Sequence, residues 1–512
     1  MQRRHLLQTL AAAGLGAGAG AWPSAQARPA RAADFAAKVS ALPLLAPFKG
    51  VDDSSGDVDC AAHALHGRWP AELRGRFYRN GPALFERAGD RYHHWFDGDG
   101  MVQQFTIGGG RGGPISHRGR LVRTAKLKAE QQAGRFLMSA LGTYIENGPA
   151  AGGPDSFNVA NTNALEHAGR VLAMWEGGSA YALDPQTLAT QGPVTWRADL
   201  QQMPFSAHPK VDAAGHLWNI GSAGPAIVAW HINPQGALAQ VQVGTSPYAD
   251  GMVHDMAVTE RCLVVPLPPV KLAFNQAPTE GPRRFAMQAG QPLRVLVMGK
   301  ADITKQRVFE LPPQMVFHVG NAHETRDGQI VLSYIAAPDT WFLDQAAVAL
   351  MSGQPVPAGR VNLQVARLNM KSGRAEVQGF DGDVEFPRIH PQRTGLSARW
   401  LLTAAAWKRF DNRNHALLHG VQLFDTQTGR ARRFDYGDQV VVEEHIAVPK
   451  PGRSGEGAGE LDAWLLGTTY DARRQATVLN LLDAAHVEDG PIAQAVLPYT
   501  LPLGFHGNFT AA

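Results

Sequence analysis

The sequence has little of what several large classes of protein require. Only Cys60 and Cys262 are available as thiols, which excludes a thiolate metal cluster, because such sites usually take three or four soft ligands. One disulfide is permitted in an oxidising compartment, but we favour two free cysteines. Charged residues make up 18% of the chain and nearly cancel, with 48 Lys and Arg against 45 Asp and Glu. Nothing in this balance indicates a nucleic-acid partner, which needs a clustered basic face.

Long apolar runs are also missing after the first 27 residues, so a membrane-spanning helix of roughly 20 residues is not expected. Those first residues have the features of an export signal instead. They contain a paired arginine at positions 3 and 4, an Ala- and Gly-rich apolar run from Leu10 to Trp22, and the small-residue site 25–27 (AQA). This pattern predicts twin-arginine export to the periplasm, and an ordinary secretory signal is the alternative.

The rest of the chain is expected to form one large domain behind a short arm. Residues 28–58 are interpreted as an N-terminal arm, extended from Arg28 to Asp53 because of Pro43 and Pro47. From residue 59 to residue 512 short apolar runs alternate with turn residues without a break in the pattern. The 55 Gly and 34 Pro residues of the chain suit many tight turns. We therefore predict a single domain over 59–512.

Short apolar runs bounded by turn residues predict strands throughout this domain. The clearest runs are RVLAMW (170–175), HLWNI (216–220), CLVVPL (262–267), QIVLSY (329–334), WLLTAA (400–405) and WLLGTTY (464–470). Pairs of such runs recur at intervals of roughly 40 to 70 residues, which is the rhythm of propeller blades. One stretch with good helix formers, Leu127 to Leu141, is expected to be helical. The fold class predicted is all-β, as a β-propeller.

Four of the 19 histidines stand in a distinctive context. His208, His254, His318 and His506 are each flanked by aromatic, apolar or small residues at the edge of an expected strand. An isolated histidine beside a strand is more often structural than a ligand. These four lie far apart in the chain, however, and the inner strands of a propeller would bring them to one point. We therefore interpret them as the ligands of one axial metal.

Four neutral imidazoles suit iron(II), copper or zinc, and six-fold coordination would leave two positions open. A ligating histidine normally donates its other N–H to a carboxylate or a carbonyl. Three glutamates lie within apolar strands where a carboxylate is costly to bury unless it is paired: Glu176, Glu385 and Glu444. We expect these three to orient histidines of the metal site.

The motifs around these residues resemble those of the carotenoid cleavage oxygenases. The similarity runs from about Leu73 to Phe509 and includes, in order, GRFYRNGP (75–82), HWFDGDGM (94–101), the segments around His208, His254 and His318, EFPRI (385–389) and GFHGNF (504–509). Each segment alone is weak evidence, but together they are specific. The resemblance identifies the chain as a bacterial member of this family with an export signal.

The resemblance implies a seven-bladed propeller with a helical and loop cap over one axial iron(II) ion per subunit, held by the four histidines. It implies that Glu176, Glu385 and Glu444 orient three of them, with Glu443 as a competitor for the third role. Family members insert O2 across a double bond of a conjugated polyene or stilbene and release two carbonyl fragments. No external reductant or organic cofactor is needed, in agreement with the lack of a Gly-rich phosphate loop.

The substrate class implied is apolar, and several aromatic residues are candidates for the lining of its tunnel: Phe157, Trp175, Phe317 and Phe505. Core packing is an equally good interpretation of each. The stilbene-cleaving branch is expected to have a lysine directly before the first glutamate. Trp175 occupies that position, which favours a carotenoid or apocarotenoid, although Lys126 or Lys128 could serve instead.

Two apolar stretches, 137–141 and 268–274, suggest a tunnel mouth that docks on a membrane, with buried packing as the alternative. Other functions stay open. They are stilbene cleavage, isomerisation without cleavage, hydrolysis with another metal, and a periplasmic binding module without activity. The complete set of four histidines and three glutamates argues against a binding module, and the lack of a carboxylate-rich ligand set argues against a hydrolase.

Overall fold

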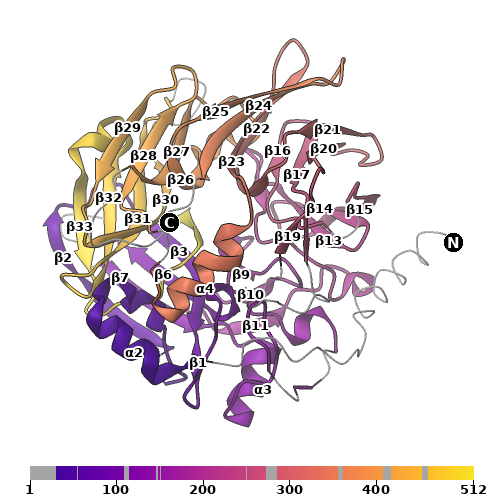
Figure 1. Ribbon diagram of the computed structural model, residues 1–512. Helices are drawn as coiled ribbons and strands as arrows, with labels where there is room; N and C mark the ends of the chain where they lie inside the picture. The colour runs from indigo at the N-terminus through magenta and orange to yellow at the C-terminus, as the bar shows by residue number, and fades with distance from the viewer. Residues whose placement is uncertain are drawn as a thin grey trace.

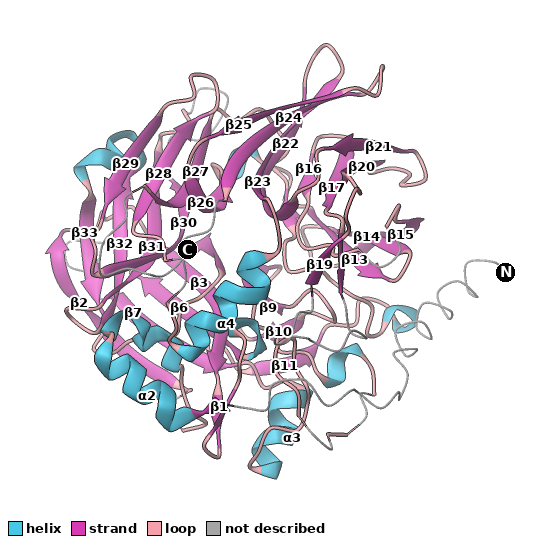
Figure 2. Cartoon of the chain, in the orientation of Figure 1, coloured by secondary structure: helices cyan, strands magenta, loops and turns pink. Residues whose placement is uncertain are grey.

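The computed structural model describes residues 30–54, 56–108, 115–145, 148–149, 152–248, 251–272, 285–355, 361–407, 417–452 and 459–512. Within these ranges β-strands are the main regular secondary structure. The strands are arranged as a ring of sheets around a common axis, with few helices, as Figure 1 and Figure 2 show. The predicted export signal lies outside the described residues.

Five sheets have four antiparallel strands each. The first contains β8 (Asn163–His167), β9 (Arg170–Met174), β10 (Tyr181–Leu183) and β11 (Thr190–Pro193). The second contains β12 (Lys210–Val211), β13 (Leu217–Ala223), β14 (Ala226–Ile232) and β15 (Leu238–Thr245). The third contains β16 (Ala257–Val258), β17 (Cys262–Leu267), β20 (Leu293–Gly299) and β21 (Gln306–Leu311). The fourth contains β22 (Met315–Glu324), β23 (Gln329–Ala337), β24 (Asn362–Asn369) and β25 (Ala375–Phe380). The fifth contains β26 (Asp383–Arg388), β27 (Trp400–Ala406), β28 (Gly420–Asp425) and β29 (Ala431–Asp435).

The ring is completed by a sheet of nine strands built from both ends of the chain. Its order is β30 (Val440–Pro449), β31 (Ala463–Asp471), β32 (Ala476–Asp483), β33 (Pro491–Val496), β2 (Val58–Gly67), β7 (Ile115–Leu121), β6 (Asp99–Ile107), β3 (Gly75–Leu84) and β34 (His506–Ala511). Two small sheets, β1 (Ala30–Arg31) with β5 (Asp90–Arg91) and β4 (Glu86–Arg87), and β18 (Val270–Leu272) with β19 (Phe285–Met287), lie outside this ring pattern.

The prediction of seven separate blades is therefore wrong, although the all-β prediction agrees with the structure. The long strand β2 is the physical reason. Residues 58–62 of β2 pair with β7, and residues 63–67 of the same strand pair with β33. One continuous strand thus joins the last strands of the chain to the first ones, so that five blades and one nine-stranded sheet make up the ring.

Local sequence patterns did locate the strands. All six apolar runs singled out in the sequence coincide with β-strands, to within one residue at an end: β9, β13, β17, β23, β27 and β31. The turn signals before them are also used, since Gly169 and Gly328 have φ of 74° and 84°. A left-handed backbone of this kind favours glycine.

The helices are short and lie over the faces and edges of the ring (Figure 2). The α-helices are α2 (Ala32–Ala41), α3 (Ala125–Ala133) and α4 (Ala347–Ser352), and α4 continues the π-helical turn η5 (Phe342–Ala346). The 3₁₀ turns are η1 (Pro43–Lys49), η2 (Trp95–Asp97), η3 (Pro154–Ser156), η4 (Ala198–Leu200), η6 (Pro391–Arg393) and η7 (Ala484–Asp489). Among the described residues, no helix is long and apolar enough to cross a membrane.

Two expectations about helices are corrected. The N-terminal arm is not extended, because α2 and η1 occupy most of it, and its prolines lie within η1 rather than in extended chain. The helix expected over 127–141 ends at Ala133, where Gly134 adopts the left-handed conformation with φ of 65°. Glycine at this position is a common helix terminator.

Apolar side chains fill the spaces between neighbouring sheets, so both faces of most sheets are buried. Between the third and fourth sheets, for example, Val295 and Phe309 pack with Ile330 and Leu332, and each is at most 1% exposed. Burying one such side chain contributes about 1.5 to 3 kcal/mol. This packing holds the sheets at fixed angles around the axis, which fixes the positions of the strand edges that face it.

Candidate metal centre

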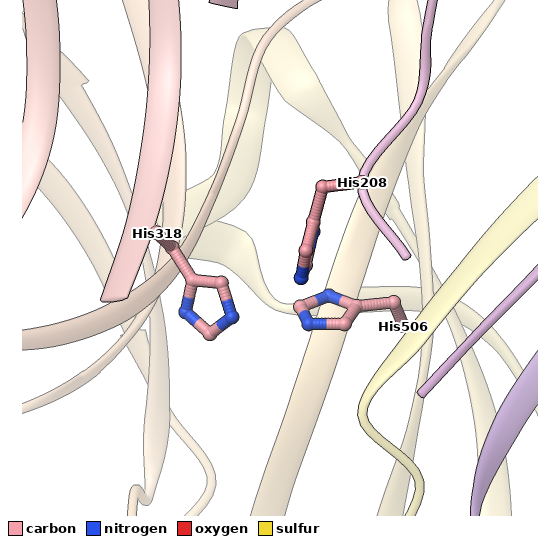
Figure 3. Close-up of side chains that lie close together, drawn as sticks. All are labelled: His208, His318 and His506. Atoms are coloured by element: carbon pink, nitrogen blue, oxygen red, sulfur yellow. The ribbon is translucent and has the colours of Figure 1, made fainter. Parts of the chain in front are cut away.

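Each of the four histidines lies in or just before the first strand of a sheet, or in the last strand of the chain. His208 precedes β12, His254 precedes β16, His318 lies in β22, and His506 begins β34. Their side chains are all about 5% exposed. Figure 3 shows the rings of His208, His318 and His506 converging from three separate segments. The ring of sheets thus brings together residues that are nearly 300 positions apart in sequence.

The imidazole nitrogens are close enough to share one ion. One ring nitrogen from each of His208, His318 and His506 lies within 4.8 Å of the other two. His254 joins them through His208, since the two Nε2 atoms are 3.0 Å apart. Two nitrogens that each bind an ion at about 2.1 Å, at right angles, would also be separated by about 3.0 Å.

Three of these rings each have a carboxylate beside Nδ1. Nδ1 of His318 donates to Oε2 of Glu385 at 2.5 Å, and Nδ1 of His506 donates to Oε1 of Glu444 at 2.8 Å. Oε2 of Glu176 lies 3.0 Å from Nδ1 of His254, although the approach is not aligned for a hydrogen bond. Protonation at Nδ1 leaves Nε2 with its lone pair, which is the tautomer that a ligand needs.

Glu444 rather than Glu443 contacts His506, and the two neighbours have separate partners. Glu444 is also bound by Arg388, from Nε at 2.9 Å, and accepts the backbone N–H of Gly507 at 2.8 Å. Glu443 forms a buried bidentate ion pair with Arg79, at 2.9 and 2.6 Å. Both glutamates thus support the segment that carries His506, but only Glu444 does so through the ring.

Irregular strand pairing aims these side chains at the axis. The register shifts between Val316 and Val319 in β22, on either side of His318. It shifts again at Glu385 in β26, and between Val442 and His445 in β30, where the two glutamates lie. A β-bulge re-aims a side chain that regular alternation would point elsewhere. Three consecutive inner strands are therefore irregular at the residues of the site.

Phe386 adds a local strain to this arrangement. It follows Glu385 and has φ of 57°, an uncommon conformation for a bulky residue. Its ring stacks on His318 at 5.6 Å and lies 5.5 Å from His506. The backbone is held in this conformation where it brings both the Glu385 carboxylate and the Phe386 ring against the histidines.

The electrostatic environment keeps two of the rings neutral. Burial lowers the pKa of His208 well below its usual range, and the neighbouring histidines lower it further. Burial also lowers the pKa of His506 to about 4, although Glu444 acts in the opposite direction. Burial disfavours the charged form of His318 too, but Glu385 and the carboxylates near it outweigh burial and raise its pKa. A neutral imidazole is the form that binds a metal ion.

The donor set fits a divalent transition metal. Nε2 of His318 is buried and has no hydrogen-bond partner within the described part of the chain, a costly arrangement unless another group binds it. The four rings together provide only neutral nitrogen donors, which suit iron(II), copper or zinc. The residues present therefore fit the iron(II) ion that the sequence resemblance implies.

The four aromatic candidates for a tunnel lie in two places. The ring of Phe317 stacks on His254 at 4.0 Å, and Phe505 is packed 5.0 Å from Phe96. Phe157 and Trp175 form a separate edge-to-face pair at 5.5 Å. The two described cavities, of about 220 and 450 Å³, include none of these residues and none of the four histidines. A role of these aromatics in substrate binding stays a prediction.

Sequence reasoning missed part of the aromatic wall beside the histidines. Phe96 lies between Phe317 and Phe505, with ring centroids 6.0 and 5.0 Å away. His94 fixes it, because its Nδ1 accepts the N–H of Phe96 while its Nε2 donates to the carbonyl of Leu343 in η5. The motif HWFDGDGM had marked this segment without indicating that it faces the site.

The two lysines proposed as substitutes for a phenol-binding lysine are placed differently. Lys126 is fully buried, and its Nζ donates to Asp99 at 2.9 Å, to Glu130 at 3.0 Å and to Tyr92 at 2.9 Å. Lys128 lies on the exposed side of α3. All three donor positions of the Lys126 ammonium group are occupied, so this side chain has none left for a ligand.

Comparisons with known proteins agree with this geometry. Residues 53–511 match the family described as retinal pigment epithelial membrane protein, RPE65. Apocarotenoid-15,15'-oxygenase from Synechocystis sp. is 29% identical over 495 residues, covering 90% of this chain and 95% of that protein. Lignostilbene-alpha,beta-dioxygenase isozyme III from Sphingomonas paucimobilis is 28% identical, covering 88% and 93%. The solved structure of cobalt-substituted Synechocystis apocarotenoid oxygenase superimposes with a TM-score of 0.80 at 26% identity, covering 95% of this chain and all of that one.

Proposed function

The chain belongs to the retinal pigment epithelial membrane protein family, and from this premise we propose that it cleaves a conjugated double bond of a carotenoid or apocarotenoid. It is a non-haem iron dioxygenase, and O2 is its co-substrate. Each oxygen atom of O2 becomes one of the two new carbonyl oxygens, so the alkene supplies all four electrons. The reaction therefore balances without an external reductant.

The observation that carries this function is the convergence of four buried histidines, three of them with a carboxylate behind the ring. His208, His254, His318 and His506 would hold the iron, which supplies the activation of O2 when it is bound. Glu385 and Glu444 hold the proton on Nδ1 of His318 and His506 and so keep each Nε2 directed inward. The binding modules considered above have no use for this arrangement.

The aromatic side chains beside the histidines would bind the substrate and exclude water. Phe96 packs against both Phe317 and Phe505 beside the histidines. An apolar wall of this kind favours a polyene over water and holds its double bond at a fixed distance from the metal position. Exclusion of water also protects the site from competing reactions.

Two observations favour a carotenoid or apocarotenoid over a stilbene. Trp175, not a lysine, precedes Glu176, and its indole ring packs on Phe157. The nearby candidate Lys126 is bound by two carboxylates and a phenol and cannot take a substrate hydroxyl. Neither position thus supplies the lysine that the stilbene-cleaving branch is expected to use to bind a phenol. Stilbene cleavage remains the second candidate, because the lignostilbene dioxygenase is nearly as similar to this chain.

The metal assignment is tested by replacing one ligand at a time. We expect His318→Ala to abolish iron(II) binding and double-bond cleavage while the protein stays folded. His323→Ala is the matched control, because His323 lies in the same strand β22 and outside the metal cluster. Iron content per chain and far-UV circular dichroism are measured for both. Full activity of a metal-free preparation would contradict the proposed function.

The substrate is tested with the iron(II)-loaded protein under air. Carotenoids, apocarotenals and hydroxystilbenes are incubated separately, and mass spectrometry identifies the carbonyl products and hence the broken bond. We expect aldehydes from a carotenoid or apocarotenoid. Products from the stilbene alone would refute the preferred substrate, and an isomerised but intact polyene would refute cleavage.

We also propose export to the periplasm, supported by the twin arginine and the AQA site in the first 27 residues. Fusion of residues 1–30 to a reporter, with Arg3 and Arg4 replaced by lysine as the control, tests the route.

For peripheral membrane contact, segment 137–141 is the better of the two candidates, because it is partly exposed whereas residues 268–270 are buried. Residues 273 and 274 lie outside the described part of the chain.

A further inference from the structure

One carboxylate beside the histidines was not expected from the sequence. Asp255 directly follows His254, and its side chain is 3% exposed. Oδ1 accepts from Nζ of Lys210 at 2.8 Å and from its neighbour's N–H, that of Met256, at 2.6 Å. Oδ2 accepts the backbone N–H of Val319 at 2.7 Å. Hydrogen bonds to a buried carboxylate are strong and directional, so three of them hold the groups around Asp255 in fixed positions.

These three donors belong to the three segments that carry three of the histidines. Lys210 is two residues after His208, and Val319 directly follows His318. Asp255 itself adjoins His254. The segments come from three different parts of the ring, preceding β12 and β16 and within β22. A single side chain therefore fixes the spacing between three ligand-bearing segments.

Asp255 also faces the one histidine that has no glutamate. Oδ1 lies 3.9 Å from Nδ1 of His208, too far for a hydrogen bond but close enough for electrostatic attraction. A carboxylate on that side favours the tautomer with the proton on Nδ1. It therefore favours Nε2 of His208 as the atom that faces the other histidines, where it lies 3.0 Å from Nε2 of His254.

We propose that Asp255 is a positioning residue of the metal site, which sets the spacing of His208, His254 and His318 and the orientation of His208. The proposal rests on the proposed function, because it assumes that these histidines bind iron. Asp255 complements the three glutamates, each of which acts on one ring, since it links the segments from which three of the rings project.

The first test is Asp255→Asn, which keeps the shape of the side chain and removes its charge. The amide keeps one acceptor oxygen but directs its NH2 group toward at least one of the three donors, so at least one of the three hydrogen bonds is lost. We expect the apparent affinity for iron(II), measured by competition with a chelator, to fall ten- to a hundredfold. The visible absorption bands of the cobalt(II)-loaded protein should shift as well, because they report the geometry of the ligands.

A competing explanation is that Asp255 only neutralises Lys210. The double variant Asp255→Asn with Lys210→Met distinguishes the two, because it removes both charges. Positioning predicts that the double variant binds iron(II) as weakly as the single variant and keeps the shifted cobalt spectrum. Recovery of wild-type affinity and spectrum in the double variant would overturn the proposal.

Two further variants keep the test decisive. Asp212→Asn is the matched control, because Asp212 also accepts from three donors, the N–H groups of Ala214 and His216 and the indole of Trp218, but in a turn away from the site. It should leave iron affinity unchanged. If Asp255→Asn does not fold, Asp255→Glu takes its place: it keeps the charge beside Lys210 but is one methylene too long for the three bonds. Positioning predicts at least a tenfold loss of affinity for Asp255→Glu, and wild-type affinity would overturn it.

The failure of this inference is distinguishable from the failure of the proposed function. If the wild-type protein does not bind iron(II), the proposed function fails. If the wild-type protein binds iron(II) and all Asp255 variants bind it equally well with unchanged cobalt spectra, only the positioning role fails.

Discussion

The buried ion pair between Arg79 and Glu443 should dominate the stability of the sheet that closes the ring. The two side chains are 1% and 4% exposed and share two hydrogen bonds, at 2.6 and 2.9 Å. Arg79→Met would leave the Glu443 carboxylate buried with only two of its four hydrogen bonds, from Thr468 and from the N–H of Gly504. Removal of one partner of a buried pair costs about 3 to 5 kcal/mol.

A double-mutant cycle isolates the pair from other effects. Glu443→Gln alone leaves Arg79 buried without a counter-charge and should cost about the same 3 to 5 kcal/mol. The double variant has no unpaired charge and loses mainly hydrogen bonds, at about 1 to 3 kcal/mol. The sum of the two single effects should therefore exceed the double effect by at least about 3 kcal/mol.

The free energy of unfolding is measured by urea titration, followed by tryptophan fluorescence and with refolding checked. The iron-free protein is used, because a bound ion adds stability by mass action and would mask the difference. Single-variant effects below about 1 kcal/mol, or effects that add without coupling, would refute the argument that these charges are desolvated and mutually dependent.

Three more predictions follow from other buried groups. Burial lowers the pKa of His117 to about 3. The unfolded chain therefore binds a proton that the folded protein does not, and stability is lost as the pH falls below about 6.5. Between pH 7 and pH 5 the wild-type protein should lose about 2 kcal/mol more of its free energy of unfolding than His117→Gln, as measured by urea titration at both pH values. Lys126→Met leaves Asp99 and Glu130 buried without their cation and should cost about 3 to 5 kcal/mol in the same assay, and a change below 1 kcal/mol would contradict it. Glu385→Gln should keep iron bound but weaken chelator-measured affinity about ten- to a hundredfold; a silent change would remove Glu385 from the site.

The residue types of the candidate site were easier to predict from the sequence than the directions in which their side chains point. The choice between Glu443 and Glu444 depended on the family resemblance, because neighbouring residues of a regular strand point to opposite faces and the sequence does not say which face is the axis. The register shift between Val442 and His445 decides the matter in the structure. Bulges have no reliable sequence signal, so the aim of His318 and Glu385 could not be derived either.

Long-range pairing explains the error in the number of blades. The runs that form β9, β23 and β31 were visible because each depends on a few adjacent residues. The pairing of β2 with β33 joins residues more than 400 positions apart, and a local sequence pattern does not predict it. Pro43 and Pro47 likewise suggested an extended arm, whereas the helix-forming composition of Ala32–Ala41 determined the structure.

The position of His506 connects ring closure to the metal site. It begins β34, which pairs with β3 from the N-terminal part of the chain, and Glu444 behind it comes from β30 at the other edge of the same nine-stranded sheet. The four histidines therefore converge only when the last strand has joined the first ones. Because the ion binds the closed ring and not the open chain, its binding free energy stabilises closure. Substitutions that weaken closure, such as those at Arg79, should therefore weaken iron binding even where they contact no ligand.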